Sequence, residues 1–266
     1  MKPVDHAALG ARVKSMLRIK ALQDTVQGQS ATLQEWNRSL ESRVAEQVSE
    51  LERFGRLKRF FSPQLDELIV SGSADDPLKS HRREVTVVFL DLRGFTAFAE
   101  TNEPDEIMSV LREYHAAMGQ AILAHEGTLE RFLGDGMMVF FNDPVPVPDP
   151  AVRAVRMVLE MRDRLAELTA KCHKRGFDLG FGAGIAQGFA TIGAVGFEGR
   201  WDYGAIGTVT NLAARLCSEA KPGQILISQK VCASVENFAE FEPVGELQLK
   251  GFLKPVPAFN VLKLKQ

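Results

Sequence analysis

Residues 85–96, VTVVFLDLRGFT, form an apolar, β-branched run with a carboxylate, Asp91, near its end. Such a run predicts a buried strand that carries a negative charge to the edge of a sheet. Residues 130–141, ERFLGDGMMVFF, place Asp135 at the tip of a predicted hairpin. If the two strands pair, the carboxylates lie close together and need a counter-cation, usually a hard divalent ion. The sequence therefore favours metal-dependent phosphate chemistry.

The turn after Asp91 favours phosphate binding as well. Gly94 separates the predicted strand from a helical stretch that begins with Phe95 and Thr96. A glycine-containing strand-to-helix turn presents backbone N–H groups and the positive end of a helix to an anion.

Two further patterns each have a functional and a structural interpretation. Glycines alternate along one predicted strand, leaving room for a ligand or for close packing of a helix: Gly180, Gly182 and Gly184. Asn211 and Arg215 lie four residues apart on one helix face, where an amide and a guanidinium can hold a ribose and a phosphate. Alternatively, Arg215 forms an ion pair with Glu219, which is again four residues away.

Composition is that of a soluble globular protein, with 266 residues, 45% hydrophobic and 25% charged. A net charge of −2 argues against general binding to nucleic acid or to an anionic membrane. No apolar run approaches the roughly 20 residues of a membrane span, and no signal-peptide pattern is present. Three widely spaced cysteines are typical of reduced thiols in a cytoplasmic protein: Cys172, Cys217 and Cys232.

The N-terminal region predicts one long helix from about residue 11 to residue 61, with Gly28 as a weak point. Apolar residues recur there at helical spacing: Leu33, Trp36, Leu40, Val44, Val48, Leu51, Phe54, Leu57 and Phe61. A helix of about 50 residues is about 75 Å long, so we expect this stripe to be buried in a parallel two-stranded coiled coil. The alternative is a set of shorter helices folded back on the domain. A short helix is predicted from Pro63 to residue 70, followed by a polar linker.

The order of predicted elements after residue 84 indicates an α+β, ferredoxin-like (split βαβ) sandwich. Strands are predicted at 85–90, 128–132, 137–141, 177–185 and 188–195, and helices at 104–125, 150–175 and 208–219. The expected organisation is a short N-terminal segment at residues 1–20, a coiled-coil helix, short helix and linker at 21–83, and a folded domain at 84–266.

Four motifs in register carry a family resemblance: FLDLRGFT, RFLGDGMMVFF, YGAIGTVTNLAARL and LQLKG. From about Glu84 to Leu262 the chain resembles the class III adenylyl/guanylyl cyclase catalytic domain. The resemblance implies a head-to-tail homodimer with two active sites at the interface. It also implies that Asp91 and Asp135, with the Leu92 carbonyl, hold two Mg²⁺ or Mn²⁺ ions.

The same resemblance implies roles for three residues of the other subunit. Asn211 would orient the ribose, Arg215 would stabilise charge on the α-phosphate, and Lys250 would pair with the terminal phosphates. The expected reaction converts ATP to 3′,5′-cyclic AMP and pyrophosphate.

Base recognition departs from the family pattern. Where adenine-specific members carry a lysine and an aspartate or threonine, this chain has Arg131 and Gly204. Arg131 keeps the donor character of lysine, which favours ATP, but Gly204 offers no acceptor for the adenine amino group. Guanine-specific members carry a glutamate at the first position, and Glu130 is adjacent but out of register. Gly182 also replaces an arginine of some members, which leaves Arg93 as a candidate triphosphate ligand.

Residues 1–20 resemble the end of a response-regulator receiver domain, through the pattern LxxRVxxxLRxK. This resemblance implies a receiver domain upstream in a longer protein. The expectation for the whole chain is an adenylate cyclase regulated through its coiled coil. The alternatives are a guanylate cyclase, a nucleotide-binding dimerisation module with low turnover, and a stalk with a structural role.

Overall fold

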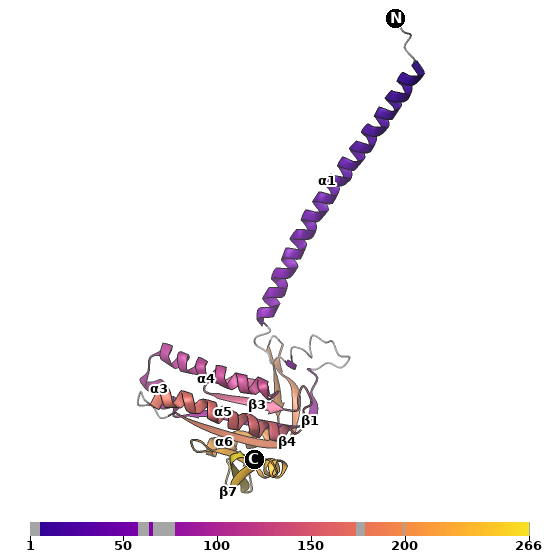
Figure 1. The fold of residues 1–266 in the computed structure, drawn as a ribbon. Helices are drawn as coiled ribbons and strands as arrows, with labels where there is room; N and C mark the ends of the chain where they lie inside the picture. The colour runs from indigo at the N-terminus through magenta and orange to yellow at the C-terminus, as the bar shows by residue number, and fades with distance from the viewer. Residues whose placement is uncertain (1–5, 58–63, 66–77, 174–178, 199, 266) are drawn as a thin grey trace. The chain divides into compact units, whose positions relative to one another are not determined.

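The computed structural model describes residues 6–57, 64–65, 78–173, 179–198 and 200–265. The chain divides into two compact units, Met1–Phe61 and Ser62–Gln266. The first unit contains α1 (His6–Leu57), a single continuous helix of 52 residues (Figure 1). The helix runs through Gly28, where it loses only about 1 kcal/mol relative to alanine, so the glycine does not divide it into separate segments.

Several sequence predictions fall wholly or partly outside the described residues. They concern the side chains of Leu51, Phe54 and Leu57, the start of the receiver-like segment at 1–5, Phe61, most of the short helix at 63–70, and the linker at 71–77. Of that short helix, Gln64 and Leu65 are helical.

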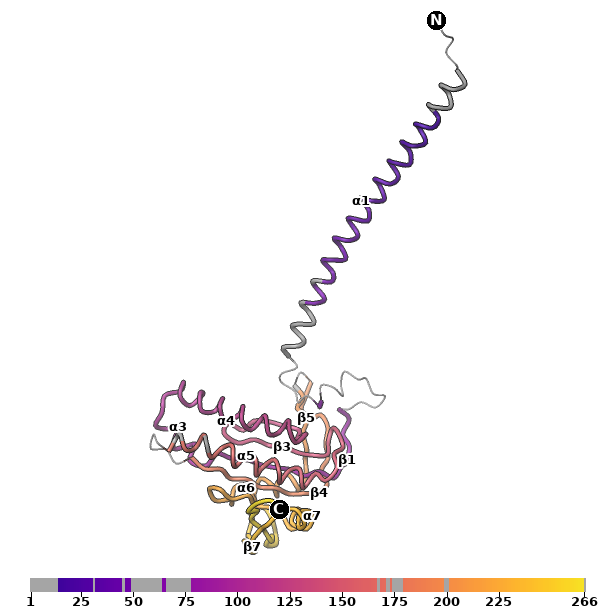
Figure 2. The backbone as a smooth tube through the Cα atoms, viewed as in Figure 1, coloured from indigo at the N-terminus to yellow at the C-terminus, as the bar shows by residue number. Residues whose placement is uncertain are grey.

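The second unit is built on one eight-stranded sheet of order β2-β3-β1-β4-β6-β8-β7, with β5 paired to β4 (Figure 2). Its strands are β1 (His81–Arg93), β2 (Thr128–Leu133), β3 (Gly136–Phe141), β4 (Gly180–Phe197), β5 (Arg200–Ile206), β6 (Ile225–Ser228), β7 (Ala239–Leu247) and β8 (Val256–Leu264). Its helices are α3 (Phe95–Thr101), α4 (Pro104–Ala124), α5 (Pro150–His173), α6 (Thr208–Glu219) and α7 (Gln229–Val235). Only the β4–β6 pair is parallel among these strand pairs. The α+β prediction is therefore confirmed.

The sequence prediction divided β4 wrongly into two strands. The segments 177–185 and 188–195 belong to one strand of 18 residues, and Phe177 lies outside the described residues. Gly188 does not interrupt the strand, because β1 pairs with β4 continuously from His81 to Arg93. That long partner holds the central part of β4 extended through its glycines.

The two faces of the sheet bury different helices, and the alternation of β1 decides which residue faces which. Val88, Leu90 and Leu92 lie in the main core with residues of α4 and α5. Val85 and Val87 lie in a second cluster with residues of α6. Asp91 has the parity of this second set, so the strand directs its carboxylate to the α6 face.

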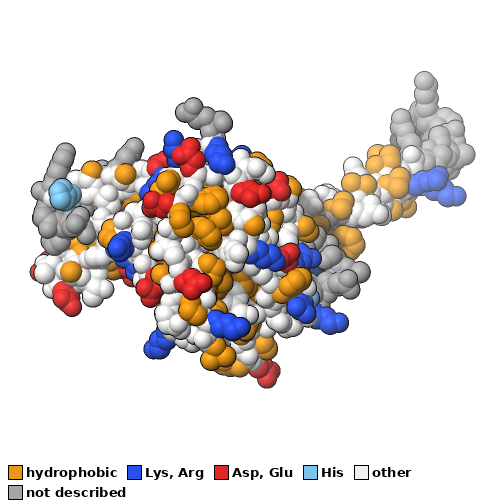
Figure 3. Space-filling view, turned by 90° about the horizontal axis from the view of Figure 1, so that it is seen from below, with side chains coloured by type: hydrophobic (Ala, Val, Ile, Leu, Met, Phe, Trp, Pro, Cys, Tyr) orange, Lys and Arg blue, Asp and Glu red, His pale blue; other side chains and the backbone are white. Residues whose placement is uncertain are grey.

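Surface charge is mixed on the face shown in Figure 3, where apolar side chains gather near the middle and charged residues of both signs surround them. Among the helices that the structure describes, none has the length and hydropathy needed to cross a bilayer.

Candidate active site

The register of two strands brings Asp91 and Asp135 together, as the sequence predicts. Antiparallel β1 and β3 pair Leu90 with Met137, so Asp91 lies next to Gly136. A Cβ atom built on Gly136 would lie 3.7 Å from Asp91 Oδ1. Asp135 directly precedes Gly136 in the hairpin turn. Burial and, to a smaller extent, the charge of Asp91 raise the pKa of Asp135, as expected for neighbouring carboxylates.

This pair offers hard oxygen ligands for divalent cations. The Leu92 side chain is buried in the core, so Leu92 can contribute only its backbone carbonyl. Within the described ranges, no cluster of three or more Asp, Glu, His or Cys side chains is found. Two carboxylates and a carbonyl suit Mg²⁺ or Mn²⁺, which complete their coordination with water and phosphate oxygens.

Arg93 holds the Asp91 carboxylate from the same face of β1. Its Nη1 donates to Asp91 Oδ2 at 2.5 Å, Nε donates to the Ala220 carbonyl at 3.2 Å, and Nη2 donates to the Cys217 carbonyl. These contacts tie the end of α6 to the carboxylate pair. Sequence reasoning named Arg93 only as a possible phosphate ligand and missed its contact with Asp91, although residues two apart on a strand share a face.

The alternating glycines of β4 have different neighbours. At Gly184 a Cβ atom would lie 2.2 Å from the Ala213 carbonyl oxygen, so the close packing of α6 is the correct interpretation there. At Gly182, opposite Asp91, it would lie 2.7 Å from Arg93 Nε. The missing side chain at Gly182 therefore makes room for the Arg93 guanidinium.

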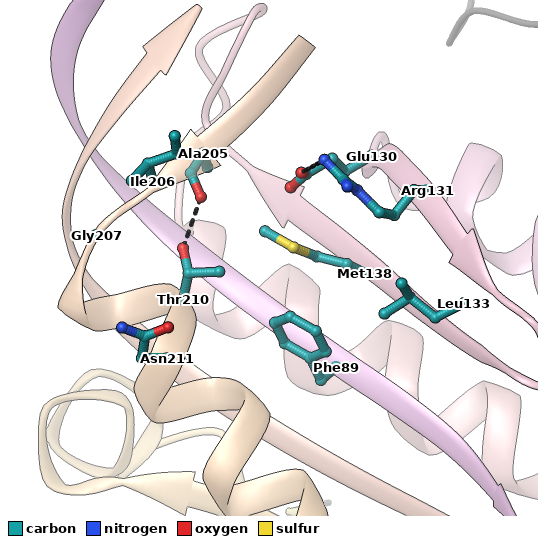
Figure 4. A pocket seen from close by; sticks show the side chains of 10 residues that line it. All are labelled: Phe89, Glu130, Arg131, Leu133, Met138, Ala205, Ile206, Gly207, Thr210 and Asn211. Atoms are coloured by element: carbon teal, nitrogen blue, oxygen red, sulfur yellow. Dashed lines mark hydrogen bonds and ion pairs between the residues drawn. The ribbon is translucent and has the colours of Figure 1, made fainter. Parts of the chain in front are cut away.

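A cavity of about 470 Å³ lies on the same sheet face, between β2 and the start of α6 (Figure 4). Arg131 and Asn211 both line it, from opposite sides. Gly204 is adjacent, since a Cβ atom there would lie 3.9 Å from Arg131 Nη2. The structure thus brings together the three residues that the resemblance assigns to base and ribose.

Glu130 also lines this cavity. The sequence analysis described Glu130 only as out of register with the family position and missed this placement. Its Oε1 accepts a hydrogen bond from Arg131 Nη2 at 2.8 Å, and its side chain is 6% exposed. Burial raises the pKa of Glu130, although Arg131 and the nearby backbone N–H of Ala205 act in the opposite direction. Nothing in the periodicity of the segment distinguishes Glu130 as a cavity residue.

Helix α6 presents Asn211 and Arg215 on its exposed side, while Leu216 is buried. In the described structure Arg215 makes no ion pair with Glu219, so that alternative is not observed. The Thr210 hydroxyl donates to the Ala205 carbonyl at 2.8 Å and fixes the first turn of the helix against β5. Both functional candidates are therefore held by a rigid element and remain accessible.

The predicted phosphate turn and the predicted lysine lie on other loops. Gly94 has a left-handed backbone, with φ 81°, and α3 begins at Phe95, followed by exposed Thr96. Lys250 is exposed in the loop between β7 and β8. The preceding residue, Leu249, is buried with Leu216 of α6, which anchors this loop beside the helix.

Sequence reasoning gave no role to His115 of α4, which supports the hairpin turn. Its Nε2 lies 3.1 Å from the Gly134 carbonyl oxygen, and its ring packs on Phe132 with centroids 4.3 Å apart. Burial lowers the pKa of His115. Its neighbour Tyr114 is fully buried, and burial raises the pKa of its hydroxyl. His115 therefore helps to position the turn that carries Asp135.

Comparison with known proteins places this arrangement in a family. The chain is 32% identical over 184 residues to adenylate cyclase 1 of Rhizobium meliloti, covering 68% of this chain and 28% of that protein. It is 32% identical over 203 residues to the adenylate cyclase of Anabaena cylindrica, covering 74% of this chain and 38% of that protein. The chain thus spans roughly a third of the length of these relatives.

Two solved structures are similar in fold and in sequence. The adenylyl cyclase CyaB from P. aeruginosa aligns with TM-score 0.69 and 34% identity, over 71% of this chain and 98% of that chain. The guanylyl cyclase Cya2 aligns with TM-score 0.65 and 34% identity, over 70% and 95% respectively. Residues 78–262 match the model of the adenylate and guanylate cyclase catalytic domain. The chain therefore belongs to the adenylate and guanylate cyclase catalytic domain family.

Proposed function

We propose that this protein is an adenylate cyclase that converts ATP to 3′,5′-cyclic AMP and pyrophosphate in a homodimer. The observation that carries the proposal is the juxtaposition of Asp91 and Asp135 on β1 and the β2–β3 turn. The adenylate cyclases among the relatives support ATP as the substrate.

Asp91, Asp135 and the Leu92 carbonyl would hold two Mg²⁺ or Mn²⁺ ions. When bound, these ions lower the proton affinity of the ribose 3′-hydroxyl and neutralise the triphosphate. The backbone N–H groups after Gly94, at Phe95 and Thr96, and the side chain of Arg93 are candidates for phosphate contacts.

Asn211, Arg215 and Lys250 would act on the nucleotide from the second subunit. Asn211 would orient the ribose, Arg215 would stabilise charge growing on the α-phosphate, and Lys250 would bind the terminal phosphates. Their exposure supports this assignment, because each is accessible to a partner. Large exposed apolar side chains also support a partner surface on β4 and β5: Phe189, Phe197, Trp201 and Ile206.

The test is to incubate the purified chain with Mn²⁺ and either ATP or GTP and to identify the product by chromatography. Cyclic AMP from ATP is expected. A predominance of cyclic GMP would establish the alternative, a guanylate cyclase, which the similarity to Cya2 and the missing acceptor at Gly204 favour. Nucleotide binding without either product would indicate a dimerisation module.

We also propose that α1 pairs with α1 of a second copy and sets the orientation of the catalytic domains. Five apolar residues of its stripe are 49% to 66% exposed: Leu33, Trp36, Leu40, Val44 and Val48. A stripe of this spacing is buried when two helices form a parallel coiled coil. A receiver domain upstream, as residues 1–20 suggest, would be one source of a signal to this helix.

The coiled-coil proposal predicts that Leu40→Glu combined with Val44→Glu weakens dimerisation and lowers specific activity at low protein concentration. The matched control is Arg38→Glu combined with Ser42→Glu, which places charges on the opposite side of the helix. Analytical ultracentrifugation and cyclase assays over a dilution series measure both effects. Equal behaviour of the two double variants would contradict the pairing.

A further inference from the structure

The base end of the cavity lacks a side chain at Gly204, and a neighbouring carboxylate fills that space. A Cβ atom at Gly204 would lie 2.9 Å from Glu130 Oε1. Glu130 therefore occupies the volume into which a side chain from position 204 would project. Figure 4 shows the Glu130 carboxylate directed from β2 across the cavity, toward the segment that contains Ala205 and Thr210.

A β-bulge explains how Glu130 reaches this position. Strand β2 pairs Leu129 with Val139 and Arg131 with Met138, so Glu130 is an extra residue without a partner in β3. In a regular strand, adjacent side chains point to opposite faces. The bulge removes this alternation and lets Glu130 and Arg131 face the same cavity.

The hydrogen bonding of Glu130 is incomplete. Oε1 accepts from Arg131 Nη2, whereas Oε2 is buried and accepts no hydrogen bond of normal geometry from the described residues, although the backbone N–H of Ala205 lies near the carboxylate. Buried carboxylate oxygens are normally paired, because an unpaired one loses its hydration without compensation. A donor on a bound ligand would complete this hydrogen bonding.

We propose that Glu130 reads the base of the nucleotide, with Oε2 accepting a hydrogen bond from the exocyclic amino group of adenine. Arg131, whose side chain is 46% exposed, donates to the adjacent ring nitrogen. Glu130 thus supplies from β2 the acceptor that Gly204 lacks on β5. The inference rests on the proposed adenylate cyclase activity and adds to it a residue that determines specificity.

The number of free acceptors favours adenine over guanine. Oε1 is already engaged by Arg131, so one carboxylate oxygen remains for the base. The edge of adenine in question presents one donor group, the amino group, beside an acceptor nitrogen. Guanine presents two adjacent donor groups, which a carboxylate pairs with best when both of its oxygens are free.

The test compares ATP with purine riboside 5′-triphosphate, which lacks only the 6-amino group. The wild-type chain is expected to prefer ATP by at least about 10-fold in kcat/KM, because a site that pairs a polar group rejects the analogue without it. Glu130→Ala is expected to bring this ratio close to one and to change the rate with the analogue little. Glu246→Ala, at an exposed glutamate on β7, is the control and should leave the ratio unchanged.

A rescue variant separates base recognition from a structural role. Gly204→Asp alone should impair ATP use, because its Cβ atom would lie within 2.9 Å of Glu130 Oε1 and would add a second carboxylate. Combined with Glu130→Ala, the same substitution should restore the preference for ATP. A structural defect caused by losing Glu130 would not be repaired in this selective way, and thermal melting of each variant verifies folding.

Two results would overturn the inference: an unchanged ATP preference in folded Glu130→Ala, or a change confined to discrimination between GTP and inosine triphosphate. If the wild-type chain makes no cyclic product, the proposed function fails but the inference is still tested. Competition of ATP and purine riboside 5′-triphosphate against a fluorescent ATP analogue then gives the same ratio as dissociation constants.

Discussion

Two carboxylate–arginine pairs on one sheet face differ in how the chain builds them. Asp91 and Arg93 are two residues apart on the regular strand β1, so the alternation of the strand places them on the same face. Glu130 and Arg131 are adjacent, and only the bulge in β2 lets both face one cavity. Asp91 is 33% exposed and Glu130 is 6% exposed. The accessible pair suits exchange of a cation, and the buried pair suits recognition of a base.

Asp91→Ala should have the largest effect and abolish cyclase activity, because it removes a proposed metal ligand. Glu130→Ala, by contrast, should alter nucleotide preference while chemistry continues. The measurement is product formation with saturating Mn²⁺ and ATP, with Asp163→Ala on the exposed side of α5 as the control. An active Asp91→Ala protein would contradict both the metal assignment and the division of roles between the two pairs.

Arg215→Ala should lower turnover by about 10²-fold or more, the effect of removing one electrostatic contact to a transition state. Since Arg215 lies outside the base cavity, the ratio of ATP to GTP use should stay constant. Steady-state kinetics measure both quantities, and circular dichroism verifies folding. Arg156→Ala, at an exposed position of α5, serves as the matched arginine control. Unchanged turnover would remove Arg215 from the catalytic residues.

Arg93→Ala should tighten Mn²⁺ binding to the nucleotide-free protein by no more than about fivefold. The guanidinium competes with the cation for Asp91 Oδ2, and a partly exposed ion pair contributes up to about 1 kcal/mol. Mn²⁺ titration followed by electron paramagnetic resonance gives the dissociation constant. Weaker binding would mean that Arg93 positions the carboxylate for the metal instead of competing with it.

The smallest expected effect concerns stability. Asp135→Asn should slightly raise the melting temperature of the metal-free protein at pH 7. Burial, aided by the charge of Asp91, raises the folded-state pKa of Asp135. The stability that Asp135 contributes is therefore lost as the pH rises from its unfolded-state pKa through its folded-state pKa. We expect a gain of at most about 2 °C, which corresponds to less than 1 kcal/mol in a domain of this size. The gain should vanish near pH 3, where both states of Asp135 are protonated.

Calorimetry with and without Mn²⁺ checks this prediction. Added Mn²⁺ should stabilise the wild-type chain more than Asp135→Asn, because a ligand that binds only the folded state shifts the unfolding equilibrium. The opposite order would show that Asp135 is not a metal ligand.

The placement of the candidate site residues on regular elements could be predicted from the sequence. Asp91 lies on a strand and Asp135 at a hairpin tip, and Asn211 and Arg215 are four apart on α6, so period and turn chemistry indicate where each residue lies on its own element. Gly28 does not interrupt α1, because one glycine does not outweigh the rest of a long helix.

Tertiary structure decided the strand bulge and the contacts of the glycines, which the period of a segment does not determine. The bulge at Glu130 depends on how β2 pairs with β3, and the contacts of Gly182 and Gly184 depend on how Arg93 and α6 approach β4. These are contacts between segments that are distant in the sequence, and local periodicity does not predict them. The sequence by itself therefore determined which residues are candidates for the proposed chemistry, through residue types at fixed spacing. The structure decided which side chains face the cavity, because strand pairing and not strand period controls the bulge.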